Sequence, residues 1–501
     1  MSQFRGLGWA VAYLSVACAL LWPAAINGRP AYFYDSAGYH ANGQAVAAAI
    51  GTKLQPFGLS AAASPQGATP AEAGAQSGSV VAIRAVAYAV FAYLGDWPGG
   101  RMVAAIIVQA LLVSAVLMIW WRRVAPDVGW RTAAAAGLLT AAVTSASWFT
   151  SFVMPDIFAG LGLLAFLILA FPSEKPPSER PLGLRAKIFL CVLTGFAFAA
   201  HVSHVPLIVG LSGFAIGQAT WTALRHRTLP KLGVILLLVA PVGIGVAAVL
   251  ATSVVGFSQV SLAPKRMPLV LARSIADGPA RWYLQEHCAT EKYVICELFP
   301  VIPTTIEDVL FGPNGLRARA TPEQMEAIRN EEPIIVARAA RAYPFRQAAK
   351  AAVAFGRQLL RFDLTDTTFT RQVIRTADGG ISLEPAVERR PVRAVANLVT
   401  YAGIAAALIY LALIARRLRP GEGAVLLLLA AGLLGNAAVT GVLSGVAHRY
   451  QGRIIWVVPV VAIGFWLARR GCRMAEISLQ FTGALPAPPG TLETLDQAAR
   501  D

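Results

Sequence analysis

The chain has 501 residues, of which 56% are hydrophobic and 14% are charged, and its formal net charge is +16. A soluble domain carries about 25% charged residues, so this composition excludes an ordinary soluble protein. Several apolar runs reach the roughly 20 residues that cross a bilayer, and they lack the alternating segments of about ten residues that build a β-barrel. The sequence therefore predicts an all-α polytopic membrane protein.

We predict ten membrane-spanning helices, at residues 7–27, 102–121, 132–153, 157–171, 187–201, 204–223, 232–256, 395–415, 423–446 and 453–469. The first run is longer than the roughly 7–15-residue core of a signal peptide, so we interpret it as an uncleaved anchor. The spans divide the chain into four parts. These are a membrane domain at 1–256 with its first outer loop at 28–101, a periplasmic domain at 257–394, three further spans at 395–470 and a cytoplasmic tail at 471–501.

The basic residues flank the apolar runs and form no basic arm or nucleic-acid motif, so we expect no nucleic-acid partner. Lys and Arg gather in the short segments on one side of the spans, and only Arg449 and Arg453 lie in the short loops on the other. Short cytoplasmic loops carry this excess of positive charge. The distribution predicts a multi-pass protein of the bacterial inner membrane with both termini in the cytoplasm.

The first outer loop opens with the aromatic stretch "RPAYFYDSAGYHANGQ", which contains Asp35 and His40. A Gly/Ala/Ser/Pro-rich piece at 58–79 follows and is expected to be mobile. Residues 79–96 are apolar and aromatic around a single Arg84, which predicts an amphipathic helix at the membrane interface. An eleventh span there would invert every later loop and break the charge bias.

The second outer segment, 257–394, is long enough for a small domain. Cys288 and Cys296 in "HCATEKYVIC" predict a disulfide in an oxidising compartment, with two free thiols as the alternative. Residues 333–361 are apolar and basic at helical spacing. One interpretation is a helix that rests on anionic headgroups or on a lipid-linked phosphate. The other is an ordinary helix of the outer domain with a solvated basic face.

The predicted topology brings ionisable side chains to the outer membrane edge: Asp35, His40, Asp156, His201, His204, His448, Arg449 and Arg453, with Tyr450 among them. Such groups are costly against lipid and are expected to face the bundle interior or a wet cavity. A carboxylate there can accept a proton from a hydroxyl, and arginines can hold a phosphate. Imidazoles beside a carboxylate can bind a divalent metal or relay protons.

Each of these residues also has an ordinary structural interpretation. Asp35 and Asp156 each precede an apolar run and can cap a helix. His201 and His204 can be interfacial hydrogen bonders, and the arginines 449 and 453 can anchor to lipid headgroups. No single residue is specific, so the functional prediction depends on their coincidence at one face.

An acid in the first outer loop, a second acid between spans 3 and 4, an interfacial helix and a late outer domain resemble the GT-C class of membrane glycosyltransferases. Protein O-mannosyltransferases and the lipid A aminoarabinose transferase belong to that class. The resemblance implies that Asp35 acts on the acceptor hydroxyl, that Asp156 is the second-loop acid, and that Arg84 lies on the interfacial helix. It implies that His201 or His204 supports the lipid phosphate or a metal. The first loop holds one acid where many relatives hold two, so the divalent metal stays open.

The sequence and this resemblance together predict transfer of a sugar from a polyprenyl-phosphate donor to a lipid or glycan acceptor hydroxyl at the outer face. The chain contains no Rossmann-like nucleotide motif, which agrees with a lipid-linked donor. We expect the departing phosphate to be held by basic side chains, namely Arg449 and Arg453 with Arg84 or Lys265 and Arg266. The alternatives are a proton-coupled transporter or lipid flippase, a non-catalytic envelope assembly protein, and a polysaccharide polymerase or ligase of another fold.

Overall fold

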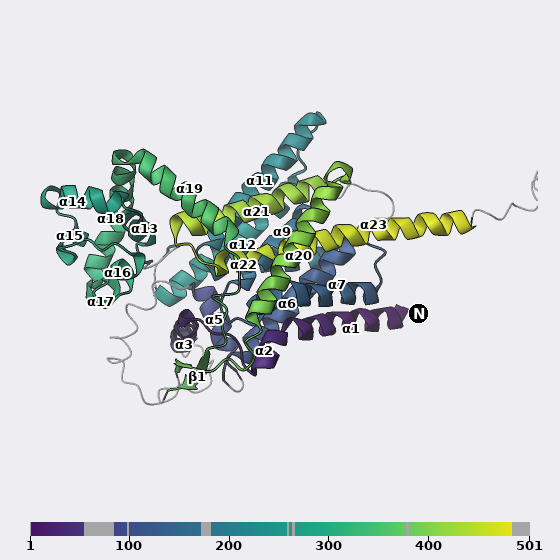
Figure 1. Cartoon of the computed structure of the whole chain (residues 1–501), viewed down its shortest axis with the longest axis horizontal. Helices are drawn as coiled ribbons and strands as arrows, with labels where there is room; N and C mark the ends of the chain where they lie inside the picture. The colour runs from purple at the N-terminus through teal and green to yellow at the C-terminus, as the bar shows by residue number, and fades with distance from the viewer. Residues whose placement is uncertain are drawn as a thin grey trace, which may run out of the picture.

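The structure is a computed structural model that describes residues 2–54, 85–97, 100–171, 182–257, 260–262, 266–376 and 380–482. These residues are mostly helical, and their one sheet is a two-stranded hairpin (Figure 1). The elements of the first half are α1 (Ser2–Leu20), α2 (Trp22–Asn27), α3 (Tyr34–Leu54), α5 (Val86–Leu94), α6 (Val103–Val124), α7 (Trp130–Val143), α8 (Ala146–Thr150), α9 (Ile157–Ala170), α10 (Leu184–Ala200), α11 (His204–Arg225) and α12 (Leu232–Phe257). Those of the second half are α13 (Leu269–Asp277), α14 (Pro279–Glu291), α15 (Val294–Leu298), α16 (Ile306–Leu310), α17 (Leu316–Arg319), α18 (Pro322–Ala342), α19 (Pro344–Leu360), β1 (Arg371–Arg375), β2 (Ile381–Pro385), α20 (Arg393–Ile414), η2 (Ala415–Arg417), α21 (Glu422–Leu443), α22 (Arg449–Ile455) and α23 (Val457–Thr482).

Six helical segments of the described chain are long and apolar enough to cross a membrane, which fits the predicted all-α membrane class: Val103–Val124, His204–Arg225, Leu232–Val255, Arg393–Arg417, Glu422–Leu443 and Arg449–Arg470. The segments Gly6–Leu20 and Ile157–Ala170 are apolar but shorter. Helices α7 and α10, which correspond to two further predicted spans, have 14 and 17 residues. A 14-residue helix is about 21 Å long, less than the roughly 30 Å of the hydrocarbon core.

Helix α9 lies at the centre of the bundle. Every residue from Ile157 to Leu169 is buried, because the helix packs against α6, α10, α21 and α22. A helix that is apolar all round belongs inside a protein core rather than on an amphipathic surface. Asp156, immediately before α9, is therefore carried to the inside of the bundle.

Helix α5 occupies part of the stretch for which an interfacial helix is predicted. It packs against α3, α10 and α12, and Tyr88, Ala89 and Ala92 are fully buried. Gly43 permits the close approach of α3, because a Cβ at this position would lie 2.2 Å from the carbonyl oxygen of Ala89. The helix is thus integrated into one end of the bundle, while Arg84 and the 58–79 piece lie outside the described residues.

The segment 257–394, predicted to lie outside, builds a hydrophobic core of its own from α13 to α18, around buried residues such as Leu271, Leu284 and Ile328. In Figure 1 these helices stand apart from the bundle, and α19 connects them to it by packing on α21. The predicted basic helix at 333–361 is two helices, since α18 ends before Tyr343 and Pro344 begins α19. Proline at a first helical position favours such a new start.

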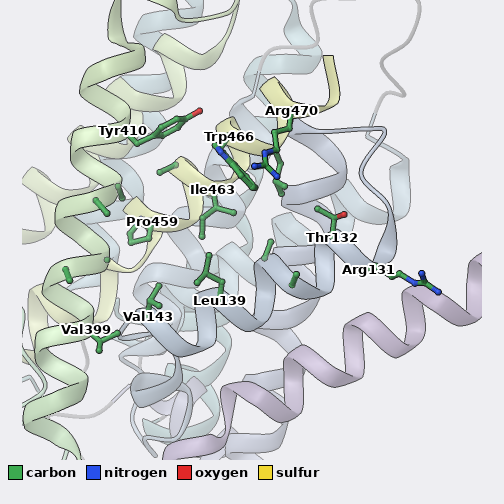
Figure 2. A pocket seen from close by; sticks show the side chains of 18 residues that line it. Arg131, Thr132, Leu139, Val143, Val399, Tyr410, Pro459, Ile463, Trp466 and Arg470 are labelled. Atoms are coloured by element: carbon green, nitrogen blue, oxygen red, sulfur yellow. The ribbon is translucent and has the colours of Figure 1, made fainter. Parts of the chain in front are cut away.

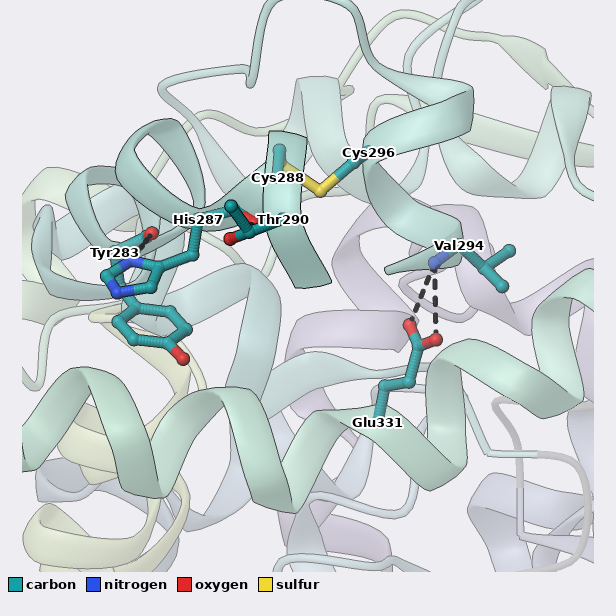
Figure 3. The surroundings of a disulfide bond; sticks show 7 residues. All are labelled: Tyr283, His287, Cys288, Thr290, Val294, Cys296 and Glu331. Atoms are coloured by element: carbon teal, nitrogen blue, oxygen red, sulfur yellow. Dashed lines mark hydrogen bonds between the residues drawn. A yellow bond between two sulfur atoms is a disulfide. The ribbon is translucent and has the colours of Figure 1, made fainter. Parts of the chain in front are cut away.

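The predicted disulfide between Cys288 and Cys296 is present, and it joins α14 to α15 with Cα atoms 5.7 Å apart. Figure 3 shows the bond beside Glu331 of α18, whose carboxylate oxygens both accept from the backbone N–H of Val294 at 3.2 Å. The short helix α15 is therefore held covalently to α14 and by hydrogen bonds to α18.

The double substitution Cys288→Ser/Cys296→Ser is expected to destabilise this part of the outer domain by about 2 to 3 kcal/mol, because the unfolded chain loses a short closed loop. In the full chain, the backbone amides of α14 and α15 should then exchange with solvent faster. Cys18→Ser, at an exposed free cysteine in α1, is the control and should leave exchange unchanged. Equal exchange in the double variant and the wild type would contradict this role.

Candidate active site

Arg453 is the centre of a polar cluster at the end of the bundle that carries α3 and α5. Its side chain is fully buried. One terminal nitrogen, Nη2, donates to Ser203 Oγ at 2.9 Å and to Asn436 Oδ1 at 3.1 Å, and Nη1 lies 3.5 Å from Asp156 Oδ1. Arg453 comes from α22, and its partners come from the starts of α11 and α9 and from α21. A fully buried guanidinium does not anchor to lipid headgroups, so that interpretation of Arg453 is wrong.

Asp156 occupies the N-cap position of α9, but its side chain makes no capping hydrogen bond. The carboxyl group is 2% exposed and faces Arg453 instead. Gly160, one turn further along α9, permits this approach, because a Cβ there would lie 2.6 Å from the Arg453 carbonyl oxygen and 2.4 Å from Trp456 Nε1. The same indole nitrogen donates to the Arg453 carbonyl at 2.9 Å.

Arg449 lies one turn before Arg453 on α22 and is half-buried. Its guanidinium carbon is 4.1 Å from the centre of the Phe33 ring and 5.1 Å from that of Tyr450. Such cation–π contacts leave the N–H edge of the guanidinium available for other acceptors. The negative charges of Asp156 and Asp35 both act on this guanidinium.

Asp35 is half-buried in the first turn of α3, two residues after Phe33. The hydrogen bond to the start of this helix comes from Ser36, whose Oγ accepts from the Phe33 N–H at 3.0 Å and donates to the Val153 carbonyl at 2.9 Å. The Ser36 bond ties α3 to the stretch that precedes Asp156. It also keeps Asp35 at the same end of the bundle as Arg449.

His201 ends α10 and His204 begins α11, with ring centres 5.2 Å apart. His201 Nδ1 lies 2.8 Å from Ser203 Oγ, and His204 Nδ1 lies 2.8 Å from the Ala197 carbonyl. Each imidazole is therefore a hydrogen bonder through one nitrogen, and Ser203 connects His201 to Arg453. Among the described residues, no group of three or more His, Cys, Asp or Glu is arranged to hold a metal ion.

Several buried polar atoms of this cluster have no hydrogen-bond partner within the described part of the chain, namely His204 Nε2, Arg449 Nη1 and Arg453 Nε, while Asp156 Oδ1 and Arg453 Nη1 meet only in their 3.5 Å ion pair. Buried charged donors are costly when their hydrogen bonds are unmade. Most of these atoms are guanidinium N–H donors, which pair with phosphate or carboxylate oxygens. The arrangement is suited to binding an anion beside two carboxylates.

The other predicted residues lie elsewhere or bind other partners. His448 Nδ1 is 2.8 Å from Asp363 Oδ2 at the entry to α22. Arg266 pairs with Glu332 of α18, and Arg84 and Lys265 fall outside the described residues. The structure therefore brings together Asp35, Asp156, His201, His204, Arg449, Tyr450 and Arg453.

His40 belongs to a second cluster, at the junction of α3 with the β1–β2 hairpin. Its Nε2 lies 3.0 Å from Asp96 Oδ2, and the same oxygen accepts from Arg375 Nη2 at 2.6 Å. Asp96 Oδ1 also accepts from the Met102 N–H at 3.2 Å. Burial alone would raise the pKa of Asp96, but hydrogen bonds from His40 and Met102 and the charge of Arg375 hold that pKa below its ordinary value.

Because the folded-state pKa of Asp96 is lowered, its ionised carboxylate stabilises the protein above the ordinary pKa of 3.8, and this stabilisation is lost as the pH falls below it. Asp96→Asn is expected to cost about 1 to 3 kcal/mol at pH 7. The apparent Tm of the variant should approach that of the wild type as the pH is lowered through this range. Asp127→Asn, at an exposed aspartate, should show no such convergence, and a constant difference for Asp96→Asn would contradict the assignment.

Sequence reasoning missed the neutral and distant partners of this end of the bundle. Asn436 lies within an apolar run, and Asp96 is 279 residues from Arg375, so neither has a local signal. Asp363 and Asp366 lie after α19, and Asp366 Oδ2 accepts from the Arg449 N–H at 3.0 Å. The two acids in "RFDLTDTTFT" are the one feature that could have drawn attention to this stretch. Comparison of the chain with protein-family models, with curated proteins and with solved structures finds no match.

Proposed function

We propose that this chain is a membrane glycosyltransferase of the GT-C type, which moves a sugar from a polyprenyl-phosphate donor to a hydroxyl of a lipid or glycan acceptor. The reaction would take place at the outer face of a bacterial inner membrane. The observation that carries the proposal is the buried Arg453 together with the half-buried Arg449, whose guanidinium groups have unmade hydrogen bonds beside Asp156 and within electrostatic range of Asp35.

In the proposed reaction, Asp35 accepts the proton of the acceptor hydroxyl as its oxygen attacks the anomeric carbon of the sugar. The bond between that carbon and the phosphate oxygen breaks, and the polyprenyl phosphate leaves with the bonding electron pair. Arg449 and Arg453 then stabilise the charge on the departing phosphate, because preorganised cations in a dry site cost no reorganisation during the reaction. Asp156 orients Arg453 through their 3.5 Å contact.

The acid in the first loop and the acid before α9 support this reaction over proton-coupled transport. Transporters carry their ionisable residues near the middle of the membrane, commonly beside broken helices. Here the ionisable residues of the cluster sit at the starts of helices α3, α11 and α22 and just before α9. They therefore lie together at one end of the bundle rather than along the middle of its helices.

Arg449→Gln is expected to slow donor cleavage by about 100-fold, because a donor to the leaving phosphate is removed. The measurement uses the full chain in vesicles with a panel of short-chain polyprenyl-phosphate sugars, and it follows both the released polyprenyl phosphate and the transferred radiolabel. Arg361→Gln, at an exposed arginine after α19, is the matched control and should retain the wild-type rate. Equal rates for Arg449→Gln and wild type would contradict the phosphate-binding role.

A further inference from the structure

A groove of about 850 Å3 runs along the bundle between α7, α20 and α23, away from the candidate active site. Its walls are mostly small or aliphatic side chains, including Ala135, Leu139, Ala406 and Ile463 (Figure 2). Binding sites for small ligands commonly enclose about 300 to 1,000 Å3. The groove is therefore large enough for a hydrophobic molecule. It opens on the side of the bundle, where Leu139 and Trp466 are exposed.

The charged side chains of the groove lie at one end only. Arg131, Thr132 and Arg470 lie at that end, with the Arg131 side chain pointing away from Arg470, while Val143 and Val399 line the opposite end (Figure 2). None of the described residues that line the groove is acidic. Arg470 stacks on Trp466, with its guanidinium carbon 4.1 Å from the ring centre, so its charge is held over the groove.

The dimensions and the charge fit an anionic lipid. Helix α7 rises by about 18 Å from Arg131 to Val143, which exceeds the roughly 15 Å depth of hydrocarbon in one leaflet. A lipid whose phosphate lies at the arginine end can therefore place its acyl chain along the apolar wall, where the chain meets no other charged side chain. Guanidinium groups bind phosphate oxygens as charge-assisted donors.

We propose that this groove is a binding site for an anionic phospholipid, whose phosphate is attracted to the end that carries Arg131 and Arg470 and whose acyl chain lies between α7, α20 and α23. The lipid comes from the leaflet at the arginine-rich helix ends, which is the cytoplasmic leaflet under the positive-inside prediction. The site is distinct from the cluster around Arg453, because none of the residues that line the groove belongs to that cluster and its arginine end lies at the start of α7 and at Arg470 of α23.

The test is native mass spectrometry of the full chain in detergent, titrated with phosphatidylglycerol or with phosphatidylcholine of the same acyl chains. The wild type should bind phosphatidylglycerol more tightly. Arg131→Gln/Arg470→Gln should weaken that binding about thirtyfold, which corresponds to about 1 kcal/mol for each arginine. Each single substitution should give about a fivefold loss, so the result does not depend on the double variant folding.

Two further variants separate the proposed site from general attraction to basic surfaces. Arg225→Gln is the matched control, because Arg225 also lies exposed at a helix end and stacks on a tryptophan, 5.1 Å from the Trp221 ring centre, outside the groove. It should leave phosphatidylglycerol binding unchanged. Ala406→Trp fills the groove and should abolish binding of both lipids.

Equal binding of the two lipids by the wild type, or an equal loss in Arg225→Gln and Arg470→Gln, would overturn the proposal. The purified wild type could also carry a second polypeptide that Ala406→Trp removes. That outcome would assign the groove to a partner helix and would likewise overturn the lipid assignment.

Discussion

Arg453→Ala is expected to lower the free energy of unfolding by about 3 to 5 kcal/mol, because it leaves Asp156 as a buried charge without its counter-ion. Ser203 and Asn436 lose their guanidinium donor at the same time. The effect should appear as a large fall in the apparent Tm in detergent and in the midpoint of unfolding by denaturing surfactant. Arg361→Ala, at an exposed arginine, should change stability by less than about 0.5 kcal/mol.

A double-mutant cycle shows whether this loss belongs to the ion pair. Asp156→Asn removes the charge that Arg453→Ala leaves unpaired, so the double variant should be more stable than the sum of the two single effects predicts. The coupling is expected to reach about 1 to 3 kcal/mol for side chains in direct contact. Strictly additive effects would contradict an energetic link between Arg453 and Asp156.

Asp35→Asn is expected to reduce sugar transfer by about 100- to 10,000-fold, because the amide cannot accept the proton of the acceptor hydroxyl. The substitution keeps the size of the side chain, and Asp35 is half-buried in a helical first turn, so the apparent Tm should stay close to the wild-type value. The measurement is the initial rate of transfer in vesicles at matched protein levels. The fall should appear in kcat, with little change in the KM for the donor.

The control for Asp35→Asn is Asp127→Asn, since Asp127 is an exposed aspartate in the connection between α6 and α7. It should transfer at the wild-type rate. A folded Asp35→Asn protein that also transfers at the wild-type rate would remove Asp35 from the mechanism. Loss of transfer together with a large fall in Tm would instead assign Asp35 a structural role.

The class of the fold could be predicted because apolar runs and flanking charges are local properties of the sequence. The Cys288–Cys296 bond was predictable for the same reason, since the two cysteines are only eight positions apart. The convergence of Asp35, Asp156 and Arg453 at one end followed from their places at the ends of predicted spans. The predicted order of the spans is therefore enough to place the charged residues of the cluster at one end of the bundle, although it does not predict their contacts.

The contacts themselves could not be predicted, because they depend on how helices pack. Asn436 reads as one polar residue in an apolar span, yet it accepts from Arg453 and donates to the Tyr450 carbonyl at 2.6 Å. The predicted length of the span at 132–153 was also wrong. The apolar pattern continues through residues 144–153, whereas helix α7 ends at Val143. Hydrogen bonds such as that from Ser147 Oγ to the Ala141 carbonyl, 2.7 Å long, stabilise that break and leave little trace in hydropathy.

The contact between Ser203 and Arg453 joins residues that are 250 positions apart, and this separation sets an order for biosynthesis. At about 5 to 20 residues per second, roughly 12 to 50 seconds of translation pass between the two residues. Asp156 is synthesised before Ser203, so its guanidinium partner is also missing throughout that interval. The hydrogen bonds of the cluster around Arg453 can therefore form only after α22 has been synthesised.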